Sequence, residues 1–408
     1  MIAFPGVERP STSIIMVTYG RRDLTRRALE ALHQCTPPVY EVVLVDNASP
    51  DGTGDWIEGA VRGVTVLRAE RNLGFGTAAN WGALSAKGRY LCFVNTDTFV
   101  HEGWLDALIE RVESFPNAVA GVPRLLNLDG TLQEAGPVVG CDGSTFAFGY
   151  GDDPNAPAYG FPRIVDYGSA ACLLVRRSAF ASVGGFDPAY GIGYCEDVDL
   201  ALALAAHGML TVYEPRAVVS HVRHGSSSPA EAEAGVIANR GTLLARWWDR
   251  IARQPPLEEL ARFPHRIVAL RDAPMAETLL VVDNGHRSPP PVVEMATRWP
   301  TMRITLLVQD SGASTPDREP SCREAGIEVV TNPTDLPSWF SARRFHYSIV
   351  TTGGACDPRL EGLIAQTQPQ ATRVQLAGNG LVETLAALGV APPRAASRLR
   401  PAAVLRAE

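Results

Sequence analysis

Runs of apolar and β-branched residues alternate with segments of helical periodicity through the first half of the chain. We predict strands at residues 13–18, 41–46, 64–68, 90–95 and 170–175, mostly continuous apolar runs typical of parallel strands buried on both faces. Between them, apolar residues at helical spacing predict crossover helices over residues 23–34, 74–86 and 103–113. This alternation predicts an α/β fold with helices on both faces of a sheet.

Polar residues follow the ends of these strands. Ligands of doubly wound sheets bind in the crevice beyond the carboxyl ends of the strands, so these residues are the first candidates for a binding site. They are Thr18, Tyr19, Asp46, Asn47, Asn95 and Asp97. A long irregular stretch over residues 126–161, rich in Gly, Asp and Pro, is expected to form a functional loop.

The second half of the chain has its own pattern. Residues 231–253 are helical in pattern, and Gln254-Pro255-Pro256 ends that helix. A second βα alternation predicts a smaller Rossmann-like unit, with strands at residues 278–283, 303–308, 327–330, 347–352 and 373–377. Gly353-Gly354 lacks a G-x-G-x-x-G frame and is a weak dinucleotide signal. We therefore divide the chain into a first domain (1–228), a helical extension and linker (229–264) and a C-terminal domain (265–408), whose end from Pro392 we expect to be frayed.

Composition narrows the function more than the fold. The 408 residues, 46% of them hydrophobic, suffice for a full core, and a net charge of -7 argues against nucleic-acid binding, which needs a basic face. Bound phosphate would need local help from a metal ion or backbone amides. The seven cysteines form no C-x-x-C pair, so neither a zinc site nor a disulfide framework is indicated. With no leader pattern and no apolar run of about 18 residues, we expect a cytoplasmic protein.

Short motifs occur in a fixed order along the first domain. They are Ile15-Met16-Val17-Thr18-Tyr19, Val45-Asp46-Asn47-Ala48-Ser49, Arg71-Asn72-Leu73-Gly74-Phe75, Asn95-Thr96-Asp97-Thr98, Gly184-Gly185-Phe186-Asp187 and Glu196-Asp197-Val198-Asp199-Leu200. In this order they resemble the family 2 glycosyltransferases, especially bacterial rhamnosyltransferase-like members, from about residue 13 to residue 228. The resemblance implies a GT-A fold and inverting sugar transfer from a nucleoside diphosphate donor, with Mg²⁺ or Mn²⁺.

The resemblance assigns the metal to Asn95-Thr96-Asp97, where a carboxylate at a strand end binds a cation that bridges the two donor phosphates. Hard oxygen ligands suit Mg²⁺ or Mn²⁺. The family pattern is Asp-x-Asp, so Asp97 is the expected ligand, whereas Asn95 offers only a neutral oxygen. His221 is the expected second ligand, with His224 as the competing choice. A strand-ending Asx turn is the alternative explanation for the motif.

The resemblance also assigns the donor nucleotide. Asp46, beside Asn47, would accept a hydrogen bond from the imide N–H of uracil or thymine, while Tyr19 stacks on the base and Thr18 binds it. A strand end followed by a helix cap explains the same motif equally well. A loop that enters a helix would bind the diphosphate through backbone amides and an arginine. Its residues are Arg71, Asn72, Gly74 and Gly76.

Glu196 and Asp197 are the candidates for acid–base chemistry. Inverting transfer needs one carboxylate to take the proton of the acceptor hydroxyl. Successive helical residues point about 100° apart, so one of the pair at most can face that hydroxyl. The resemblance favours Asp197 as the base and Glu196 as the residue that positions the acceptor. The alternative is that either acid caps the helix over residues 198–207.

Other functions and partners stay open from the sequence. A non-catalytic nucleotide-sugar-binding protein and a nucleotidyltransferase are the alternatives. For the transferase, the resemblance favours a dTDP- or UDP-sugar donor, rhamnose first, and a glycan or lipid-linked saccharide acceptor. Trp247-Trp248 and nearby arginines could contact the inner face of a membrane, although packing between domains is favoured. The C-terminal domain is expected to be a scaffold or docking domain rather than a second transferase.

Overall fold

The computed structural model describes two compact units, Met1–Ile267 and Val268–Glu408. In the first unit the described residues are 1–37, 39–115, 117–155, 159–160, 162–223 and 229–262. In the second they are 278–283, 292, 303–308, 327–331, 337, 347–351, 358–367 and 372–376.

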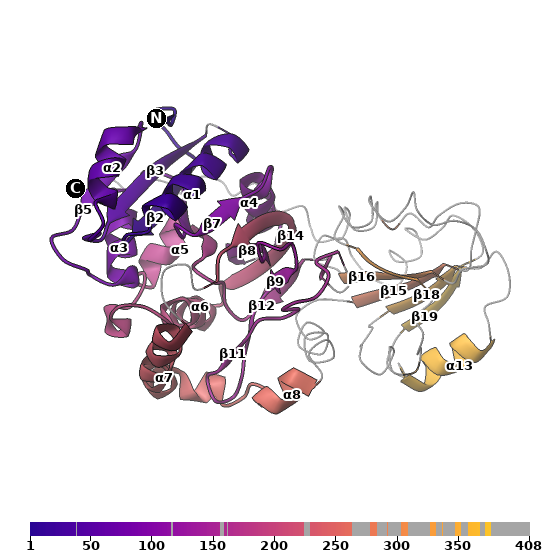
Figure 1. The fold of residues 1–408 in the computed structure, drawn as a ribbon. Coiled ribbons are helices and arrows are strands. Elements are labelled where there is room, and N and C mark those ends of the chain that lie inside the picture. The colour runs from indigo at the N-terminus through magenta and orange to yellow at the C-terminus, as the bar shows by residue number, and fades with distance from the viewer. Residues whose placement is uncertain are drawn as a thin grey trace, which may run out of the picture. The chain divides into compact units, whose positions relative to one another are not determined.

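The first unit is built on a 10-stranded sheet whose main path runs β12-β14-β8-β13-β6-β2-β3-β5 (Figure 1). The strands are β2 Thr12–Thr18, β3 Tyr40–Asp46, β5 Thr65–Arg68, β6 Tyr90–Val94, β8 Ala118–Leu126, β12 Arg163–Val165, β13 Cys172–Arg176 and β14 Leu210–His221. Two further strands extend the sheet, because β7 (Thr98–Val100) pairs with β14 and β9 (Leu132–Glu134) pairs with β8. The predicted strands are confirmed as β2, β3, β5, β6 and β13.

Helices cover the two faces of this sheet. They are α1 Arg22–Cys35, α2 Thr53–Ala60, α3 Phe75–Ser85, α4 Trp104–Ser114, α5 Arg177–Ser182, α6 Glu196–Ala206, α7 Pro229–Ile251 and α8 Leu257–Arg262, with a 3-10 turn η2 at Pro188–Tyr190. Two short pairs lie outside the sheet: β1 Ile2–Ala3 with β4 Val61–Arg62, and β10 Val138–Val139 with β11 Thr145–Phe146. The predicted helices correspond to α1, α3, α4 and α7.

Burial on both faces explains the continuous apolar run of β2. Ile14 and Met16 lie in the main core, which also contains apolar residues of α1 and α4. Ile15 faces the opposite way, toward α3, where a Cβ on Gly82 would lie 2.6 Å from its Cγ2. Burying one such side chain contributes roughly 1.5–3 kcal/mol.

The sheet is mixed rather than wholly parallel. β2 runs parallel to β3 and β6, so Thr18, Asp46 and the end of β6 reach the same edge. β13, predicted as one of the parallel strands, is instead antiparallel to β6. The stretch over residues 126–161 is also more regular than expected, since it contains β9, β10 and β11.

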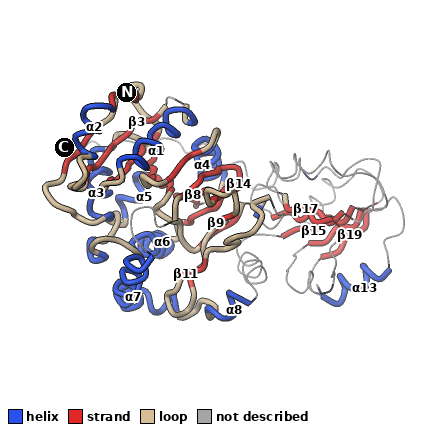
Figure 2. The backbone as a smooth tube through the Cα atoms, viewed as in Figure 1, coloured by secondary structure: helices blue, strands red, loops and turns tan. Residues whose placement is uncertain are grey.

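The second unit contains a 5-stranded parallel sheet of order β17-β16-β15-β18-β19 (Figure 2). Its elements are β15 Thr278–Asp283, β16 Arg303–Val308, β17 Glu328–Thr331, β18 Tyr347–Thr351, α13 Pro358–Thr367 and β19 Thr372–Leu376. In chain order this is the 3-2-1-4-5 arrangement of Rossmann sheets, which confirms the predicted fold of this unit. Gly353-Gly354 and the chain from Pro392 lie outside the described residues.

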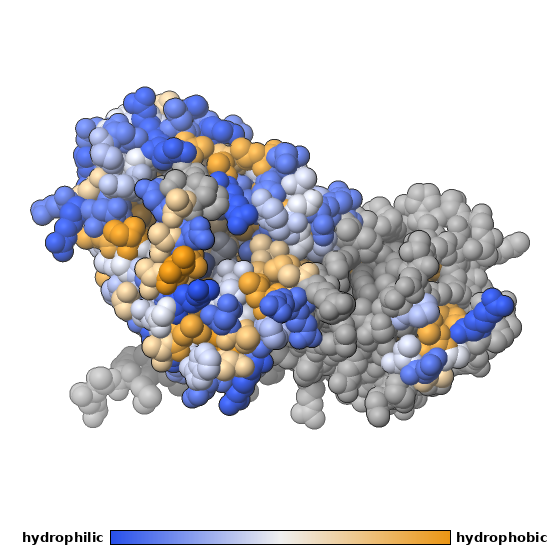
Figure 3. Space-filling model, turned by 60° about the horizontal axis from the view of Figure 1, so that its bottom comes forward, coloured by the Kyte–Doolittle hydropathy of each residue, from blue (hydrophilic) through white to orange (hydrophobic). Residues whose placement is uncertain are grey.

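Helix α7 packs within the first unit. Trp247 donates its indole N–H to Oδ1 of Asp199 on α6 (2.7 Å), whereas Trp248 is 57% exposed. On the face in Figure 3, hydrophobic surface occurs in separate patches between hydrophilic ones. None of the described helices is long and apolar enough to span a bilayer.

Glu214 of β14 is a fully buried carboxylate with two cationic partners. Its Oε2 lies 2.7 Å from Nε of Arg111 on α4, and its Oε1 lies 2.9 Å from Nε of Arg216. Although burial alone would raise it, the pKa of Glu214 is lowered by the hydrogen bonds and charges of Arg216 and Arg111. The carboxylate thereby ties β14 to α4.

Glu214→Gln should destabilise the first unit by about 3 kcal/mol, because it leaves the buried guanidinium of Arg111 without its compensating charge. Urea unfolding followed by tryptophan fluorescence measures the change. The matched control is Glu110→Gln, which removes the 65% exposed carboxylate that pairs with Arg216, and it should cost less than about 1 kcal/mol. Equal losses from the two substitutions would contradict this role of Glu214.

Candidate active site

The carboxyl ends of β2 and β3 form one side of the candidate site. Thr18 and Asp46 are register partners at these strand ends, and both are buried. The Asp46 carboxylate accepts from the N–H of Ser49 (3.0 Å) and lies 3.4 Å from Nε of Arg68. The hydroxyl of Thr18 donates to the carbonyl of Gly20 (3.2 Å) and lies 3.3 Å from the hydroxyl of Thr25. Tyr19, in contrast, is 49% exposed. The ring of Tyr19 is therefore accessible to a ligand at this edge.

Asn47 fixes the loop that carries the predicted diphosphate contacts. Its amide donates to Oδ1 of Asn72 (2.9 Å), and its own Oδ1 accepts from the N–H of Leu73 (2.8 Å). Asn72 Oδ1 also accepts from the N–H of Gly74 (2.9 Å). Gly74 has a φ of 80°, and a Cβ there would overlap the carbonyl oxygen of Gly191, so only glycine fits.

Gly76 and Arg71 differ in their surroundings. Gly76 is buried in α3, where a Cβ would lie 3.1 Å from Cβ of Phe186 and 3.9 Å from Cβ of Glu196. The small size of Gly76 therefore lets α3 pack beside the start of α6. Arg71 is exposed on the loop, where its guanidinium is accessible to an anion.

Asp97 and His221 come together where β7 pairs with β14. The register places Thr98 opposite His221, and the carbonyl of Asp97 accepts from the N–H of Val222 (2.9 Å). Nε2 of His221 lies 3.4 Å from Oδ1 of Asp97. This oxygen is buried and has no hydrogen-bond partner among the described residues.

This pair offers one oxygen and one nitrogen ligand, so a divalent cation held here would need further ligands to complete its coordination. Carboxylate oxygens suit Mn²⁺ and Mg²⁺, and Mg²⁺ sites often combine one or two carboxylates with substrate phosphates, whereas imidazole is a ligand of softer divalent metals. The orphaned Oδ1 of Asp97 is the atom that a cation would satisfy. Within the described parts of the chain, no group of three or more His, Cys, Asp or Glu residues could hold an ion alone.

The remaining members of the predicted metal motif lie beside this pair. Asn95 is partly exposed and its N–H donates to the carbonyl of Ala171 (3.0 Å), while Thr96 is buried. His224, the competing ligand, lies outside the described residues. The geometry thus brings His221, Asp97 and the Asn95 turn together.

Glu196 and Asp197 occupy the first turn of α6. The helix begins at Glu196 with Cys195 as its N-cap residue, so neither acid caps a helix that starts at Val198. Asp197 accepts from the N–H groups of Ala170 (3.3 Å) and Val198 (2.8 Å). Oε2 of Glu196 is buried without a hydrogen-bond partner among the described groups. Burial raises the pKa of both carboxyl groups, and the charge of Asp197 adds to the rise at Glu196.

A strained turn orients this acidic pair. Tyr194 and Cys195 have φ values of 75° and 71°. Such left-handed conformations cost roughly 1–3 kcal/mol each in residues other than glycine. Asn239 of α7 holds the turn, because its Nδ2 lies 2.7–2.9 Å from the carbonyl oxygens of Tyr190, Gly193 and Tyr194.

Strand β9 supplies two polar residues that the sequence pattern did not single out. Oε1 of Gln133 lies 2.7 Å from Nδ1 of His221. Burial raises the pKa of the adjacent Glu134 to about 8, with the charge of Asp197 adding to the rise and Arg223 opposing it. In the sequence, Gln133 and Glu134 are only a pair of polar residues in a stretch that was expected to be irregular. Their partners lie far along the chain, so no local pattern could identify them.

One short segment joins the two halves of the site. The carbonyl of Ala171 accepts from the N–H of Asn95 (3.0 Å) and the hydroxyl of Thr98 (3.1 Å). The N–H of the preceding Ala170 donates to Asp197 (3.3 Å). The predicted metal-binding turn and the predicted base are therefore attached to consecutive residues.

Comparison with known proteins shows which class of protein this chain belongs to. A model of glycosyl transferase family 2 matches residues 13–153. The N-acetylglucosaminyl-diphospho-decaprenol L-rhamnosyltransferase of Mycobacterium tuberculosis is 30% identical over 283 residues, which are 62% of this chain and 92% of that protein. The O-antigen biosynthesis protein RfbC of Myxococcus xanthus is 31% identical over 242 residues, 56% of this chain and 18% of that protein.

Among solved structures, GalNAc-T7 with UDP, GalNAc and Mn²⁺ is similar at 19% identity and a TM-score of 0.47, over 65% of this chain and 51% of that one. The match to the family model and to the 30% identical relative defines a glycosyltransferase, and the mixed α/β sheet of the first unit is that of the GT-A fold. The chain belongs to glycosyltransferase family 2.

Glu134→Gln should stabilise the protein at alkaline pH relative to acidic pH. The folded-state pKa of about 8 exceeds the ordinary 4.5, so the wild type loses stability as pH rises through this window. The amide does not ionise. The change corresponds to roughly 4 kcal/mol, so the difference in Tm between variant and wild type should grow by roughly 8–16 °C from about pH 5 to about pH 8.5. Exposed Glu102→Gln is the control and should give a constant difference in Tm. A constant difference for Glu134→Gln would refute the raised pKa of Glu134.

Proposed function

We propose that the protein is a metal-dependent, inverting glycosyltransferase that moves a sugar from a nucleoside diphosphate donor to a glycan or lipid-linked saccharide. The attachment of the Asn95–Asp97 turn and the Asp197 carboxylate to consecutive residues, Ala171 and Ala170, is the observation that carries the proposal. It supports a site in which the leaving group and the attacking hydroxyl bind next to each other.

The chain's own groups would divide the work. Asp97 and His221 would hold Mg²⁺ or Mn²⁺, which neutralises the diphosphate leaving group. Asp197 would take the proton of the acceptor hydroxyl as its oxygen attacks the anomeric carbon from the face opposite the leaving group, which inverts the configuration. Glu196, buried beside it, would position the acceptor. A raised pKa suits Asp197 to this role, because a base is most effective when its pKa lies near the working pH.

The donor would lie along the strand ends. Asp46 would bind the imide of thymine or uracil and Tyr19 would stack on the base. Thr18 and Asn47 would line the nucleotide site at the ends of β2 and β3. Arg71, Asn72, Gly74 and Gly76 would border the diphosphate. The rhamnosyltransferase named above favours rhamnose as the sugar and a lipid-linked saccharide as the acceptor.

An acceptor anchored in a lipid would bring a cytoplasmic enzyme to the inner face of the membrane. Large apolar side chains are exposed at Ile192, beside the turn that precedes α6, and at Ile237 and Trp248 of α7. These residues could make peripheral contact with lipid. In the proposed division of the chain, transfer belongs to residues 1–228, residues 229–264 form the extension and residues 265–408 serve as a scaffold or docking domain.

Release of nucleoside diphosphate from a panel of dTDP- and UDP-sugars tests the activity. Wild type should release it from one donor only when Mg²⁺ or Mn²⁺ is added. Asp97→Ala should lower the rate by about 10²–10³-fold and Asp197→Asn by about 10²–10⁴-fold, because they remove a metal ligand and the base. Release of pyrophosphate would indicate a nucleotidyltransferase, and binding without release would indicate a sensor; either result contradicts the proposal.

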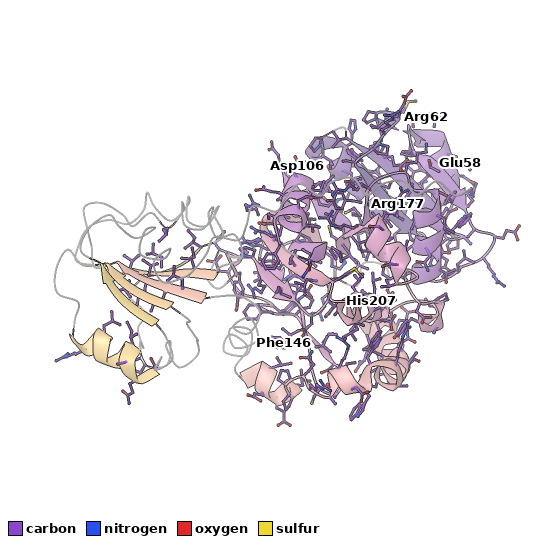
Figure 4. All side chains as sticks on the ribbon, turned by 180° about the vertical axis from the view of Figure 1, so that it is seen from behind. Glu58, Arg62, Asp106, Phe146, Arg177 and His207 are labelled. Carbon is purple, nitrogen blue, oxygen red and sulfur yellow. The ribbon has the colours of Figure 1, made fainter. Side chains whose placement is uncertain are left out.

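Asp106→Asn is the matched control for these substitutions. Asp106 is exposed on α4 (Figure 4) and its change should leave the rate within about twofold of wild type. The anomeric configuration of the product, read by NMR, tests inversion separately. A product that keeps the configuration of the donor would exclude direct displacement by the acceptor hydroxyl.

The pH dependence of kcat/KM tests the base. Because burial raises the pKa of Asp197 above the ordinary 3.8, the base becomes protonated at a higher pH than a free aspartate. The rate should therefore fall on the acid side around pH 6, tenfold for each further pH unit. A rate that stays level down to about pH 4.5 would rule out a buried carboxylate as the base.

A further inference from the structure

The hydrogen-bond partners of His221 determine which of its ring nitrogens carries the hydrogen. We propose that Gln133 is a positioning residue that holds His221 as the Nδ1–H tautomer, so that a bare Nε2 faces Asp97 before any cation binds. This inference deepens the proposed metal site and rests on it for its function. It is carried by hydrogen bonds that can be followed outward from β9.

The orientation of the Gln133 amide is set by two acceptors. Asn127 donates through Nδ2 to Oγ1 of Thr131 (2.9 Å) and to the carbonyl of Leu132 (3.3 Å), which turns its Oδ1 toward Gln133. Nε2 of Gln133 donates to that Oδ1 (2.9 Å) and to the carbonyl of His221 (3.1 Å). Reversing the amide would place its oxygen against two oxygens and lose both bonds.

The orientation of the amide in turn sets the tautomer of the imidazole. Oε1 of Gln133 can only accept, and it lies 2.7 Å from Nδ1 of His221, so Nδ1 must donate. A neutral imidazole has one N–H, which leaves Nε2 with a lone pair. Gln133 is only 7% exposed, so water competes little for these bonds.

The choice of tautomer decides whether Asp97 stays available. With Nε2 bare, two lone pairs face each other across 3.4 Å, and Oδ1 of Asp97 has no hydrogen-bond partner in the described part of the chain. In the other tautomer Nε2–H would donate to Asp97 and occupy the lone pairs that a cation needs. Gln133 therefore prevents a hydrogen bond between Nε2 of His221 and Asp97.

The tautomer is measured directly on the metal-free wild type. Nitrogen-15 NMR of histidine-labelled protein at alkaline pH, where imidazole rings are neutral, distinguishes protonated from bare ring nitrogens. The resonances of His221 are assigned as those missing from His221→Gln. We expect a protonated Nδ1 and a bare Nε2. A protonated Nε2 overturns the proposal, and this measurement needs no variant of Gln133.

Gln133→Leu tests the consequence for metal binding. Leucine has a similar size but accepts no hydrogen bond, so His221 is free to take the other tautomer. Mn²⁺ affinity, followed by electron paramagnetic resonance of the free ion, should fall about 10–100-fold in the presence of UDP or dTDP. Unchanged Mn²⁺ affinity in this variant overturns the proposal.

Ser220→Ala is the matched control on the same strand. It removes a hydroxyl that lies 2.8 Å from Nε2 of His101, a histidine contact outside the metal pair, and should leave Mn²⁺ affinity unchanged. If Gln133→Leu does not fold, Asn127→Ala replaces it, because it removes an acceptor that orients the Gln133 amide. It should weaken Mn²⁺ binding in the same direction, and wild-type affinity would count against the proposal.

The outcomes separate this inference from the proposed function. Mn²⁺ binding that is lost in Asp97→Ala but retained in Gln133→Leu supports the metal site and refutes the role of Gln133. A wild type that binds no Mn²⁺, with or without nucleotide, refutes the metal-dependent function. In that case the wild-type tautomer still decides whether Gln133 sets the hydrogen on His221.

Discussion

The candidate site contains buried carboxyl groups that lack some of their hydrogen-bond partners among the described residues, and the surrounding structure must hold these groups in place. Glu214 shows the usual arrangement, since arginines pair with both of its oxygens. Asp97 and Glu196 are also buried, yet each has one oxygen without a hydrogen-bond partner in the part of the chain that the structure describes. Leaving such an atom unsatisfied costs roughly 1–3 kcal/mol. Contacts elsewhere must therefore hold these groups in place.

Those contacts come from residues that surround the candidate acid–base pair. Asp197 and Asp199 stand two positions apart on α6 but have different surroundings. Asp199 accepts from the indole of Trp247 and the hydroxyl of Tyr190, so it anchors α6 to α7. Asp197 accepts only backbone N–H groups among the described residues, and these fix the direction of its carboxylate. Asn239 adds the restraint that keeps the turn before α6 in its strained form.

The sequence predicted best those parts whose signal is local. β2 and β3 are continuous apolar runs because both faces of the sheet are covered, and their ends identified Thr18 and Asp46. β14 escaped prediction because it carries Glu214, Pro215 and Arg216, and its buried charge is compensated by an arginine 103 residues away. No local pattern contains that information.

The same reasoning explains why Gln133 and Glu134 were missed. Their partners are distant in sequence: Gln133 meets His221 across 88 residues, and Glu134 shares its surroundings with Asp197. The two neighbours are organised by different forces. Gln133 acts through directed hydrogen bonds between neutral groups, whereas burial and the nearby negative charge of Asp197 raise the pKa of Glu134. Because alternate residues of a strand face opposite ways, one short strand can serve both halves of the site while keeping their electrostatics apart.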